Sequence, residues 1–314
     1  MSDEPAGALS ARAALLDGLG MHAEMAELRQ SIRDWAAQAD EEMQALLEWQ
    51  LLGPSKYFRP ATIFACHRAV SRRPVGPSLI RSATALELFH NVSLIIDDIL
   101  DRSRFRRGKL TLHCRFGHLP ALMCSGYIMA DGFRLVADDP FAVRCLSELM
   151  KRLGVAECLQ WRLRRHPLGI EDWRVIAGED TGSMFEVCGC LGTRDERLRR
   201  FGGLLGILYH GCDDVGDVRG ADALGGGGSE DMRDGILTLP AALAIRDARA
   251  AVEFRGGPEK GREVLERAIA ASLPEAEEYL DRIAEEALEE ARRAAHDPEP
   301  LEQLVRHTRS LSGL

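Results

Sequence analysis

Aromatic residues make up only 6% of this chain of 314 residues, and strand-like alternation of apolar and polar residues is absent. Apolar residues recur instead at helical spacing, in segments separated by proline and glycine. No apolar run approaches the roughly 20 residues that a membrane-spanning helix needs, and the N-terminus lacks the charged-then-apolar order of a signal peptide. These absences predict an all-α protein in the cytoplasm, without a transmembrane segment.

The eight cysteines include no CxxC pair and no spacing typical of a zinc site or a disulfide framework. They are expected to be small core residues in a reducing compartment. The formal net charge is −9, whereas a protein that binds a phosphate backbone needs a basic face. Nucleic acid is therefore not an expected partner.

Short joints separate the helical segments, as in a helical bundle. The expected segments lie near residues 24–51, 58–71, 78–101, 119–137, 141–165, 171–189, 195–219, 238–254, 259–272, 274–295 and 299–311. Residues 221–235 form a longer, polar and glycine-rich stretch. Two interpretations of it stay open, a flexible connector and a lid over a site.

An aspartate triplet occurs twice, each time at the end of a long apolar stretch. The first is Asp97, Asp98 and Asp101 in SLIIDDILD, and the second is Asp213, Asp214 and Asp217 in LYHGCDDVGD. Residues four apart in a helix lie about 40° from each other on one face, so each triplet contains a pair of carboxylates that can chelate one cation. Oxygen donors without interleaved histidine or cysteine favour Mg²⁺, which takes phosphate oxygens as further ligands.

Acidic residues at helical spacing normally form a solvated face or a helix end. The residues before Asp97, LELFHNVSLII, are almost wholly apolar, which predicts a buried helix instead. Buried like charges raise one another's pKa and become neutral unless a cation is present. The two triplets therefore predict one shared site that holds metal.

Basic residues flank the triplets. Lys56 and Arg59 stand in GPSKYFRP beside a Gly-Pro joint, where both can meet one anion, and His90 lies seven residues before the first aspartate on the same helix face. Arg106 and Arg107 belong to the run RSRFRRGKLTLH, whose guanidinium groups suit diphosphate oxygens. Solvated surface charge and a core histidine are the alternative interpretations.

These motifs together resemble the trans-type isoprenyl diphosphate synthases of the polyprenyl synthetase family. The family motifs GGKxxRP, DDxxD, RRGxPTxH, KTGxLF, FQxxDDxxD and DxxxGKxTLP correspond in order to residues 54–60 and to DDILD, RRGKLTLH, DTGSMF, YHGCDDVGD and DMRDGILTLP. The resemblance implies an all-α, isoprenoid synthase-type bundle around a central cavity. It also implies one domain over residues 1–314 and, commonly, a homodimer.

The resemblance implies a Mg²⁺-dependent prenyltransferase that condenses an allylic prenyl diphosphate with isopentenyl diphosphate. All six aspartates would bind the metal and act in catalysis. The implied substrate-binding residues are Lys56, Arg59, His90, Arg106, Arg107, Thr181, His210 and Arg233. In the family, bulky residues shortly before the first aspartate close the shaft that receives the product. Val92 and Ser93 stand there and are modest in size, whereas Phe89 lies one turn deeper, which predicts a product longer than ten carbons.

Several positions on the allylic side depart from the family pattern. Asp180 stands at the lysine of KTGxLF and Ile236 at the lysine of GKxT, so two positive charges that face the allylic diphosphate in the family are missing. Two alternatives therefore stay open. One is a terpene cyclase-like enzyme that ionises a single prenyl diphosphate, and the other is a non-catalytic subunit that binds prenyl diphosphate. The retained isopentenyl-diphosphate positions favour elongation.

Overall fold

Helices form nearly all of the regular structure in the residues that the computed structural model describes, namely 18–53, 55–220, 234–256 and 262–313. The α-helices are α2 (His22–Ala37), α3 (Glu41–Leu51), α4 (Phe58–Val70), α5 (Pro77–Leu100), α6 (Leu112–Phe116), α7 (His118–Leu135), α8 (Pro140–Leu163), α9 (Ile170–Ala177), α10 (Ser183–Thr193), α11 (Arg199–Val218), α13 (Leu239–Ala244), α14 (Ala248–Arg255), α15 (Glu263–Ala294) and α16 (Glu299–Arg309). A π-helix η1 (Gly178–Gly182), a 3₁₀-helix η2 (Ser310–Ser312) and two strands, β1 (Phe105–Arg106) and β2 (Lys109–Leu110), complete the description. The predicted all-α fold is confirmed.

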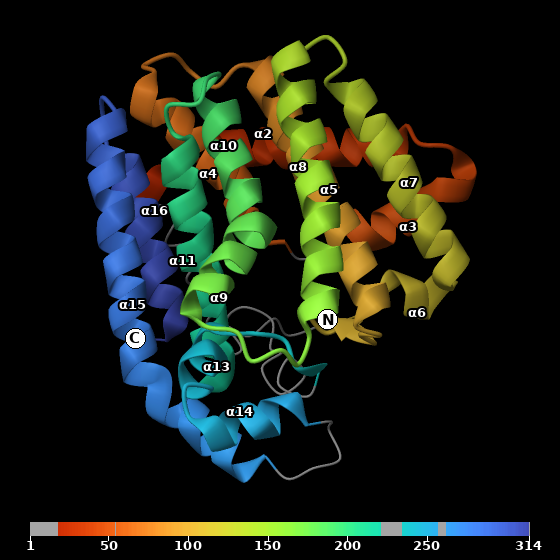
Figure 1. The fold of residues 1–314 in the computed structure, drawn as a ribbon. Coiled ribbons are helices and arrows are strands. Elements are labelled where there is room, and N and C mark those ends of the chain that lie inside the picture. Colours follow the sequence, from red (N-terminus) through yellow and green to blue (C-terminus); the bar gives the residue numbers. More distant parts are fainter. Residues whose placement is uncertain (1–17, 54, 221–233, 257–261, 314) are drawn as a thin grey trace.

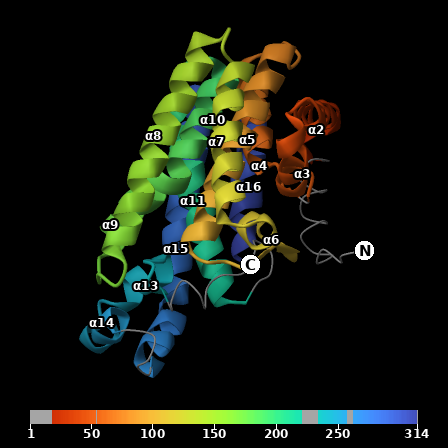
Figure 2. The same ribbon diagram turned by 90° about the vertical axis from the view of Figure 1, so that its right-hand side faces the viewer.

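The long helices are arranged side by side. In Figure 1, α5, α8, α10 and α11 run in nearly the same direction, and α15 and α16 lie beyond α11. Figure 2 shows α2 and α3 outside this bundle on one side, while α13 and α14 lie at the lower end, against the first half of α15. The core therefore sits between long helices that are far apart in the sequence.

Helix α5 is the central core helix and carries the first aspartate triplet at its end. Buried residues extend almost without a break from Leu79 to Val92, and Phe89 is fully buried. Contrary to the expectation from the apolar runs, α5 is long and apolar enough to cross a membrane by length and composition. However, 78% of its most apolar window is buried inside the protein, as in a core helix.

Helix boundaries differ from the sequence expectation at several breaks. The segment predicted at 24–51 is two helices, because residues 38–40 leave the helix between α2 and α3. The segment at 238–254 is also divided, since the side chain of Asp247 accepts the first free N–H groups of α14 and so starts a new helix. Apolar periodicity continues across such breaks and therefore does not reveal them.

Two segments were predicted, 259–272 and 274–295, but from Glu263 onward the structure has the single helix α15, which contains Pro274. A proline inside a helix removes one hydrogen bond and crowds the preceding turn. Here the buried face of α15, which includes Ile269 and Leu280 on either side of the proline, packs on the bundle and outweighs that loss. The strands β1 and β2 were also not expected, because each has only two residues.

Candidate active site

A cavity of about 300 Å³ lies between α5, α8, α11 and the junction of η1 with α10, at the ends of α5 and α11 that carry the aspartates. Its lining residues include Arg59, His90, Ser93, Leu94, Asp97, Asp101, Arg106, Glu157, Gln160, Arg164, Asp180, Thr181, Tyr209, His210, Asp213, Asp214, Asp217 and Ile236. The two triplets, which are more than a hundred residues apart in the chain, thus contribute to one cavity.

Two carboxylates of the first triplet line the cavity, and the third bonds to an arginine. Asp97 and Asp101 line the cavity, as expected for residues one helical turn apart. Asp98 does not line it, and its Oδ1 accepts a hydrogen bond from Nε of Arg106 at 2.8 Å. Since Arg106 lines the cavity, the buried Asp98 carboxylate holds this guanidinium group in the wall.

The second triplet lines the cavity from α11 with all three carboxylates. Oδ2 of Asp214 accepts hydrogen bonds from Nε1 of Trp173 at 2.8 Å and from the backbone N–H of Leu239 at 2.7 Å. Burial raises the pKa of Asp214 to about 6, although nearby His210 and these hydrogen bonds lower it. Asp214 is therefore fixed by the protein, while Asp213 and Asp217 form the pair one helical turn apart.

The acidic lining residues form the acidic wall of the cavity, namely Asp97, Asp101, Glu157, Asp180, Asp213, Asp214 and Asp217. Burial and the mutual repulsion of these carboxylates disfavour their charged forms. Burial raises the pKa of Asp97 well above its ordinary value, and the carboxyl groups of Glu157 and Asp180 raise it further. Burial also raises the pKa of Asp213. Oδ1 of Asp97 is buried and accepts no hydrogen bond from any described residue. A divalent cation would remove this cost, because it favours the charged form of every carboxylate near it.

The donor set fits a hard cation such as Mg²⁺, since the acidic wall offers carboxylate oxygens and the orphaned Oδ1 of Asp97 needs a partner. Over the described part of the chain, no three histidine, cysteine, aspartate or glutamate side chains already stand together as a metal site. Mg²⁺ usually keeps several water ligands and binds through one or two carboxylates plus substrate phosphates. Two aspartate pairs that line the same cavity fit this mode of binding.

The basic wall of the cavity comprises Arg59, His90 and Arg106. Arg106 belongs to a small β-hairpin. Strands β1 and β2 pair in antiparallel register, with Arg106 opposite Lys109. The two residues between them, Arg107 and Gly108, have φ values of 52° and 72°, as in a type I′ turn, where glycine is favoured. This geometry explains the RRGK sequence and places Arg106 in the cavity wall. Arg107 lies at the exposed tip and is not among the lining residues.

Arg59 and His90 meet at the same wall. Nη1 of Arg59 lies 3.1 Å from Nε2 of His90, and the guanidinium group lies over the ring of Phe185, 5.4 Å from its centroid. Burial lowers the pKa of His90 well below its ordinary value, and the surrounding guanidinium groups, Arg59 first, lower it further. The imidazole is therefore neutral, and the positive charge at this wall belongs to arginine.

Lys56 lies in the segment just before α4 and does not line the cavity. Oγ of Ser55 donates a hydrogen bond to Oε1 of Glu87 at 3.0 Å, which fastens the segment before α4 to α5. Tyr57 has a φ of 50°, a left-handed conformation that turns the chain from Lys56 into α4. The positive charge of Lys56 lowers the pKa of Asp213 against the larger effect of burial, so Lys56 and the acidic wall interact electrostatically.

Thr181 and His210 line the cavity in mutual contact, as Oγ1 of Thr181 lies 2.9 Å from Nδ1 of His210. The π-helix η1 contains Thr181 and ends at Gly182, so the regular α-helical hydrogen bonding is interrupted here. A Cβ atom added at Gly206 of α11 would lie 2.7 Å from Cα of Gly182. Close backbone packing at these two glycines therefore brings Thr181 and His210 together.

Three polar lining residues on α8 and its C-terminal end, Glu157, Gln160 and Arg164, were not predicted. Their spacing of three and four residues, on one face of an amphipathic helix, is the signal that could have identified them. Burial, together with the nearby carboxyl groups of Asp180 and Asp101, raises the pKa of Glu157 to about 7. The acidic wall thus extends onto a helix that carries neither triplet.

The residues predicted for the product shaft are only partly in the cavity wall. Ser93 lines the cavity, whereas Val92 and Phe89 are fully buried in the core and do not line it. The Phe89 ring packs against Phe133 of α7, with centroids 4.8 Å apart. Arg233 and most of the glycine-rich stretch at 221–235 lie outside the described residues, so the lid and connector interpretations both stay open.

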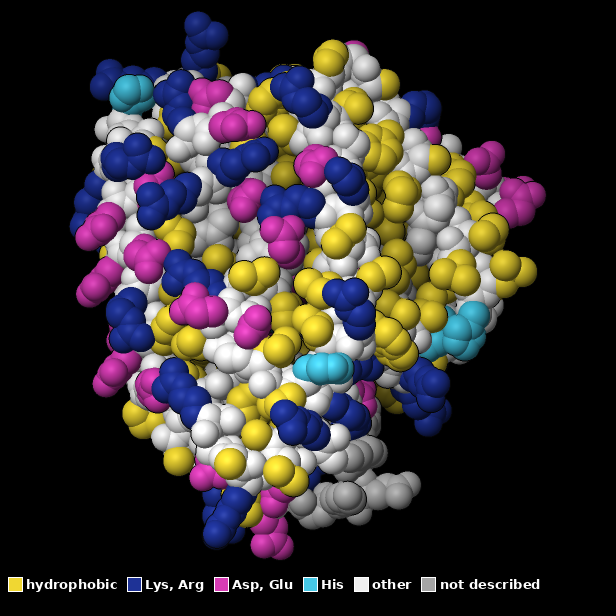
Figure 3. All heavy atoms as spheres, viewed as in Figure 1, with side chains coloured by type: hydrophobic (Ala, Val, Ile, Leu, Met, Phe, Trp, Pro, Cys, Tyr) yellow, Lys and Arg dark blue, Asp and Glu magenta, His cyan; other side chains and the backbone are white. Residues whose placement is uncertain are grey.

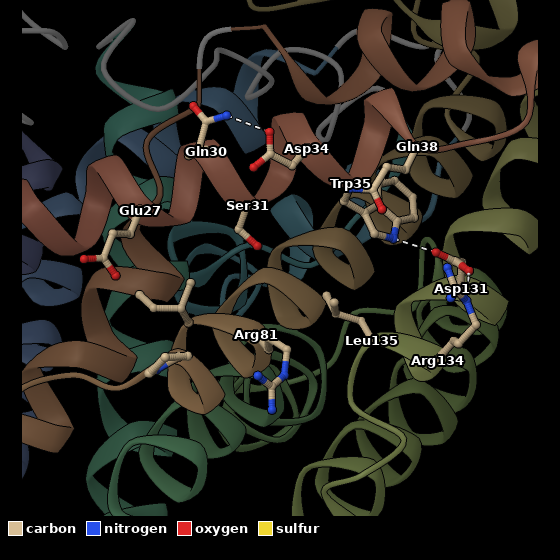
Figure 4. Close-up of a pocket in the computed structure, with 12 residues that line it drawn as sticks. Glu27, Gln30, Ser31, Asp34, Trp35, Gln38, Arg81, Asp131, Arg134 and Leu135 are labelled. Carbon is tan, nitrogen blue, oxygen red and sulfur yellow. Dashed lines mark hydrogen bonds and ion pairs between the residues drawn. The ribbon is translucent and has the colours of Figure 1, made fainter.

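A second cleft lies between α2, α5 and α7 (Figure 4). Several of its polar and charged side chains already bond to each other. Asp131 accepts hydrogen bonds from Nε1 of Trp35 at 2.7 Å and from Nε of Arg134 at 2.5 Å, and Asp34 accepts one from Nε2 of Gln30 at 2.6 Å. The carboxylates of Asp131 and Asp34 are thus already engaged, and Arg81 pairs with Asp138, which is not among the lining residues. The cavity with the aspartates is therefore the candidate active site.

Two known proteins with similar sequences are prenyl diphosphate synthases. The nonaprenyl diphosphate synthase of Mycobacterium tuberculosis is 28% identical over 240 residues, which cover 73% of this chain and 71% of that protein. The octaprenyl diphosphate synthase of Haemophilus influenzae is 28% identical over 258 residues, which cover 77% of each protein.

Solved structures show the same fold. The heptaprenyl diphosphate synthase of Staphylococcus aureus gives a TM-score of 0.83 at 20% identity, covering 94% of this chain and 98% of the other. The polyprenyl synthase of Caulobacter crescentus, complexed with calcium and isoprenyl diphosphate, gives 0.83 at 24% identity, covering 94% and 97%. Residues 40–273, well over half of the chain, match the family described as polyprenyl synthetase. This protein therefore belongs to the polyprenyl synthetase family.

Proposed function

We propose that this protein is a Mg²⁺-dependent prenyltransferase that condenses an allylic prenyl diphosphate with isopentenyl diphosphate into a longer trans-prenyl diphosphate. One observation carries the proposal. The pairs Asp97/Asp101 and Asp213/Asp217 line a single cavity, and the adjoining wall holds Arg59 beside a neutral His90. This arrangement provides a cation site for one diphosphate and an arginine site for another.

The metal would be bound by the two aspartate pairs, with Asp98 and Asp214 completing the two triplets. Mg²⁺ supplies positive charge that stabilises a departing diphosphate. The Caulobacter polyprenyl synthase was solved with calcium and isoprenyl diphosphate together, which supports a divalent cation next to a prenyl diphosphate on this fold. In the present chain, the orphaned Oδ1 of Asp97 is the observation that supports a cation.

The arginines stabilise charge that develops during the reaction. The C–O bond of the allylic substrate breaks, and the diphosphate leaves with the electron pair. Arg106, held by Asp98 at 2.8 Å, donates N–H groups toward the negative oxygens, and its preorganised position lowers the barrier. The double bond of isopentenyl diphosphate then forms the new C–C bond with the allylic cation, and the released diphosphate takes up the proton that is lost.

Isopentenyl diphosphate would be held by Lys56, Arg59, His90 and Arg107. Because His90 is neutral, it acts as a hydrogen-bonding group that orients Arg59 or the ligand, while Arg59 supplies the charge. The growing chain would extend past Ser93 toward Val92 and Phe89, which are buried in the core. Thr181 and His210 would contact the allylic substrate from the opposite wall.

The protein is proposed to be a cytoplasmic homodimer whose chain forms one domain. All eight cysteines are free, as expected in a reducing compartment. Hydrophobic side chains gather over α7 and α8 on the face shown in Figure 3. The exposed large hydrophobic residues of the protein include Leu119, Leu122 and Met123 of α7 and Trp161 of α8. An exposed apolar surface of this kind favours association with a second copy.

Two alternatives gain support from a specific observation. Asp180 and Ile236 both line the cavity, so the wall that faces the allylic diphosphate has an acid and an apolar residue at the family lysine positions. A terpene cyclase-like enzyme would ionise one prenyl diphosphate there without isopentenyl diphosphate. A non-catalytic partner subunit would bind prenyl diphosphate and release no product.

One experiment separates these functions. Purified protein and Mg²⁺ are incubated with geranyl or farnesyl diphosphate, with and without isopentenyl diphosphate, and organic extracts are analysed before and after phosphatase treatment. Longer prenyl alcohols that appear only with both substrates and only after phosphatase support elongation. Hydrocarbons formed from one substrate would show cyclisation, and tight binding without turnover would indicate the non-catalytic role.

A further inference from the structure

Arg164 lies in the cavity wall on the side where the family lysines are missing. It follows directly after the last residue of α8, and it lines the cavity together with Asp180 and Ile236, which stand at the two lysine positions. The other two arginines among the described lining residues contact other groups, Arg106 the carboxylate of Asp98 and Arg59 the ring of His90. Arg164 differs from both because its chain neighbour Arg165 bonds to Gly235, the residue directly before Ile236.

The guanidinium group of Arg164 is held in place but keeps unused hydrogen-bonding capacity. Its Nη2 donates to Oδ1 of Asp101 at 2.7 Å, and its Cζ lies 4.5 Å from the centroid of the Trp161 ring. The side chain is only 20% exposed. Its Nε is buried and has no hydrogen-bond partner among the described residues. A buried N–H without an acceptor is costly, and a ligand oxygen would supply one.

A backbone hydrogen bond joins the segments that carry Arg164 and Ile236. The N–H of Arg165 donates to the carbonyl of Gly235 at 2.8 Å, and the chain neighbours of these two residues, Arg164 and Ile236, both line the cavity. Gly235 has a φ of 73°, and a Cβ atom added there would lie 2.5 Å from Cγ of Arg165. Glycine thus permits the close approach of the two segments.

We infer that Arg164 binds the diphosphate group of the allylic substrate and supplies, from the end of α8, the positive charge that Ile236 does not provide. This inference rests on the proposed function. With Nη2 committed to Asp101, the guanidinium group still has N–H donors for a phosphate oxygen. Because Asp101 also belongs to the first aspartate pair, one carboxylate orients both the cation site and this arginine.

The test compares four variants with the wild-type protein. R164L removes the charge, and R164K keeps a charge but loses the planar fork. R162L is the matched control, because Arg162 is an exposed arginine in the last turn of the same helix. The double variant R164L/I236K moves a positive charge to the family position. Each protein is checked for helical content and melting temperature before it is assayed.

Two measurements are made on each variant. The first is the steady-state KM for farnesyl diphosphate and, separately, the KM for isopentenyl diphosphate. The second is calorimetric binding of farnesyl thiolodiphosphate, an unreactive analogue, in the presence of Mg²⁺. R164L loses one charge-assisted hydrogen bond. It should therefore raise the KM for farnesyl diphosphate, and the dissociation constant of the analogue, by about 10- to 100-fold.

The inference also predicts an unchanged KM for isopentenyl diphosphate in R164L, an intermediate R164K, a wild-type-like R162L, and recovery of analogue binding in R164L/I236K. It is overturned if folded R164L binds the analogue as tightly as R162L does. It is also overturned if R164L lowers kcat alone and the added I236K substitution restores nothing, because Arg164 would then only position Asp101. Wild-type protein that binds the analogue but does not elongate farnesyl diphosphate with isopentenyl diphosphate would refute the proposed function, while the binding measurements would still test Arg164.

Discussion

The indole Nε1 of Trp173 donates a hydrogen bond to Oδ2 of Asp214 at 2.8 Å, and the Trp173 side chain is fully buried. This hydrogen bond links α9, which contains Trp173, to the second aspartate triplet on α11. The carboxylate that the indole holds lines the cavity, so this contact ties the packing of the core to the geometry of the candidate metal site.

Replacing Trp173 by phenylalanine should therefore affect both stability and the site. The variant loses one hydrogen bond to a carboxylate and leaves a small void, so the free energy of unfolding should fall by about 1–3 kcal/mol. The pKa of Asp214, already raised to about 6, should rise further. Urea unfolding measures the first effect and NMR titration the second. Trp161→Phe, at an exposed position, is the control and should change neither.

Replacing Asp97 by asparagine should separate function from stability. Activity should fall by at least about a hundredfold, because a group that helps to place cationic charge at the reacting centre is lost. The metal-free protein should melt at the same or a higher temperature, since burial and neighbouring carboxylates raise the pKa of Asp97 and penalise its charge. Kinetics and calorimetric melting without Mg²⁺ provide the measurements. A large loss of stability would mean that Asp97 is structural.

Glu157 should make the metal-free protein less stable as the pH rises. Its pKa is raised from an ordinary value of 4.5 to about 7 in the folded protein, so the folded state holds the proton more tightly than the unfolded state. The stabilisation from this proton is complete below about pH 4.5 and is lost as the pH rises through 7. The free energy of unfolding should therefore decrease over this window.

The variant Glu157→Gln tests this effect directly, because an amide does not titrate in that range. Its free energy of unfolding, measured by denaturant titration at several pH values without Mg²⁺, should depend less steeply on pH than that of the wild type. Glu148→Gln, at an exposed position on the same helix, is the control. Equal slopes for wild type and Glu157→Gln would contradict the prediction.

Phe89 and Gly132 should set product length in opposite directions. Phe89 lies one turn below Ser93 and is fully buried, so Phe89→Leu should deepen the shaft and shift the products toward longer chains. A Cβ atom at Gly132 would lie 2.6 Å from Cε1 of Phe89, so Gly132→Ala should push this ring and shorten the products. Chromatography of the dephosphorylated products reads the distribution. A shift of both variants in the same direction would argue against this shaft.

Much of the site was predictable because its geometry is local. The four-residue spacing of Asp97 and Asp101, and of Asp213 and Asp217, places each pair on one helix face whatever surrounds it. The apolar residues before Asp97 likewise indicate burial. The RRGK sequence was recognised by resemblance, and the structure adds its physical reason, a two-residue turn with positive φ at Arg107 and Gly108.

The amino-acid sequence by itself determined the helical class, the two carboxylate pairs and the family, because helix periodicity and motif spacing are properties of neighbouring residues. Only the tertiary structure decided that Asp98 holds Arg106, that Trp173 holds Asp214, and that Arg164 and Ile236 line the same cavity. Such contacts depend on which helix faces meet in the bundle, and this is decided by close packing between residues that lie far apart in the chain.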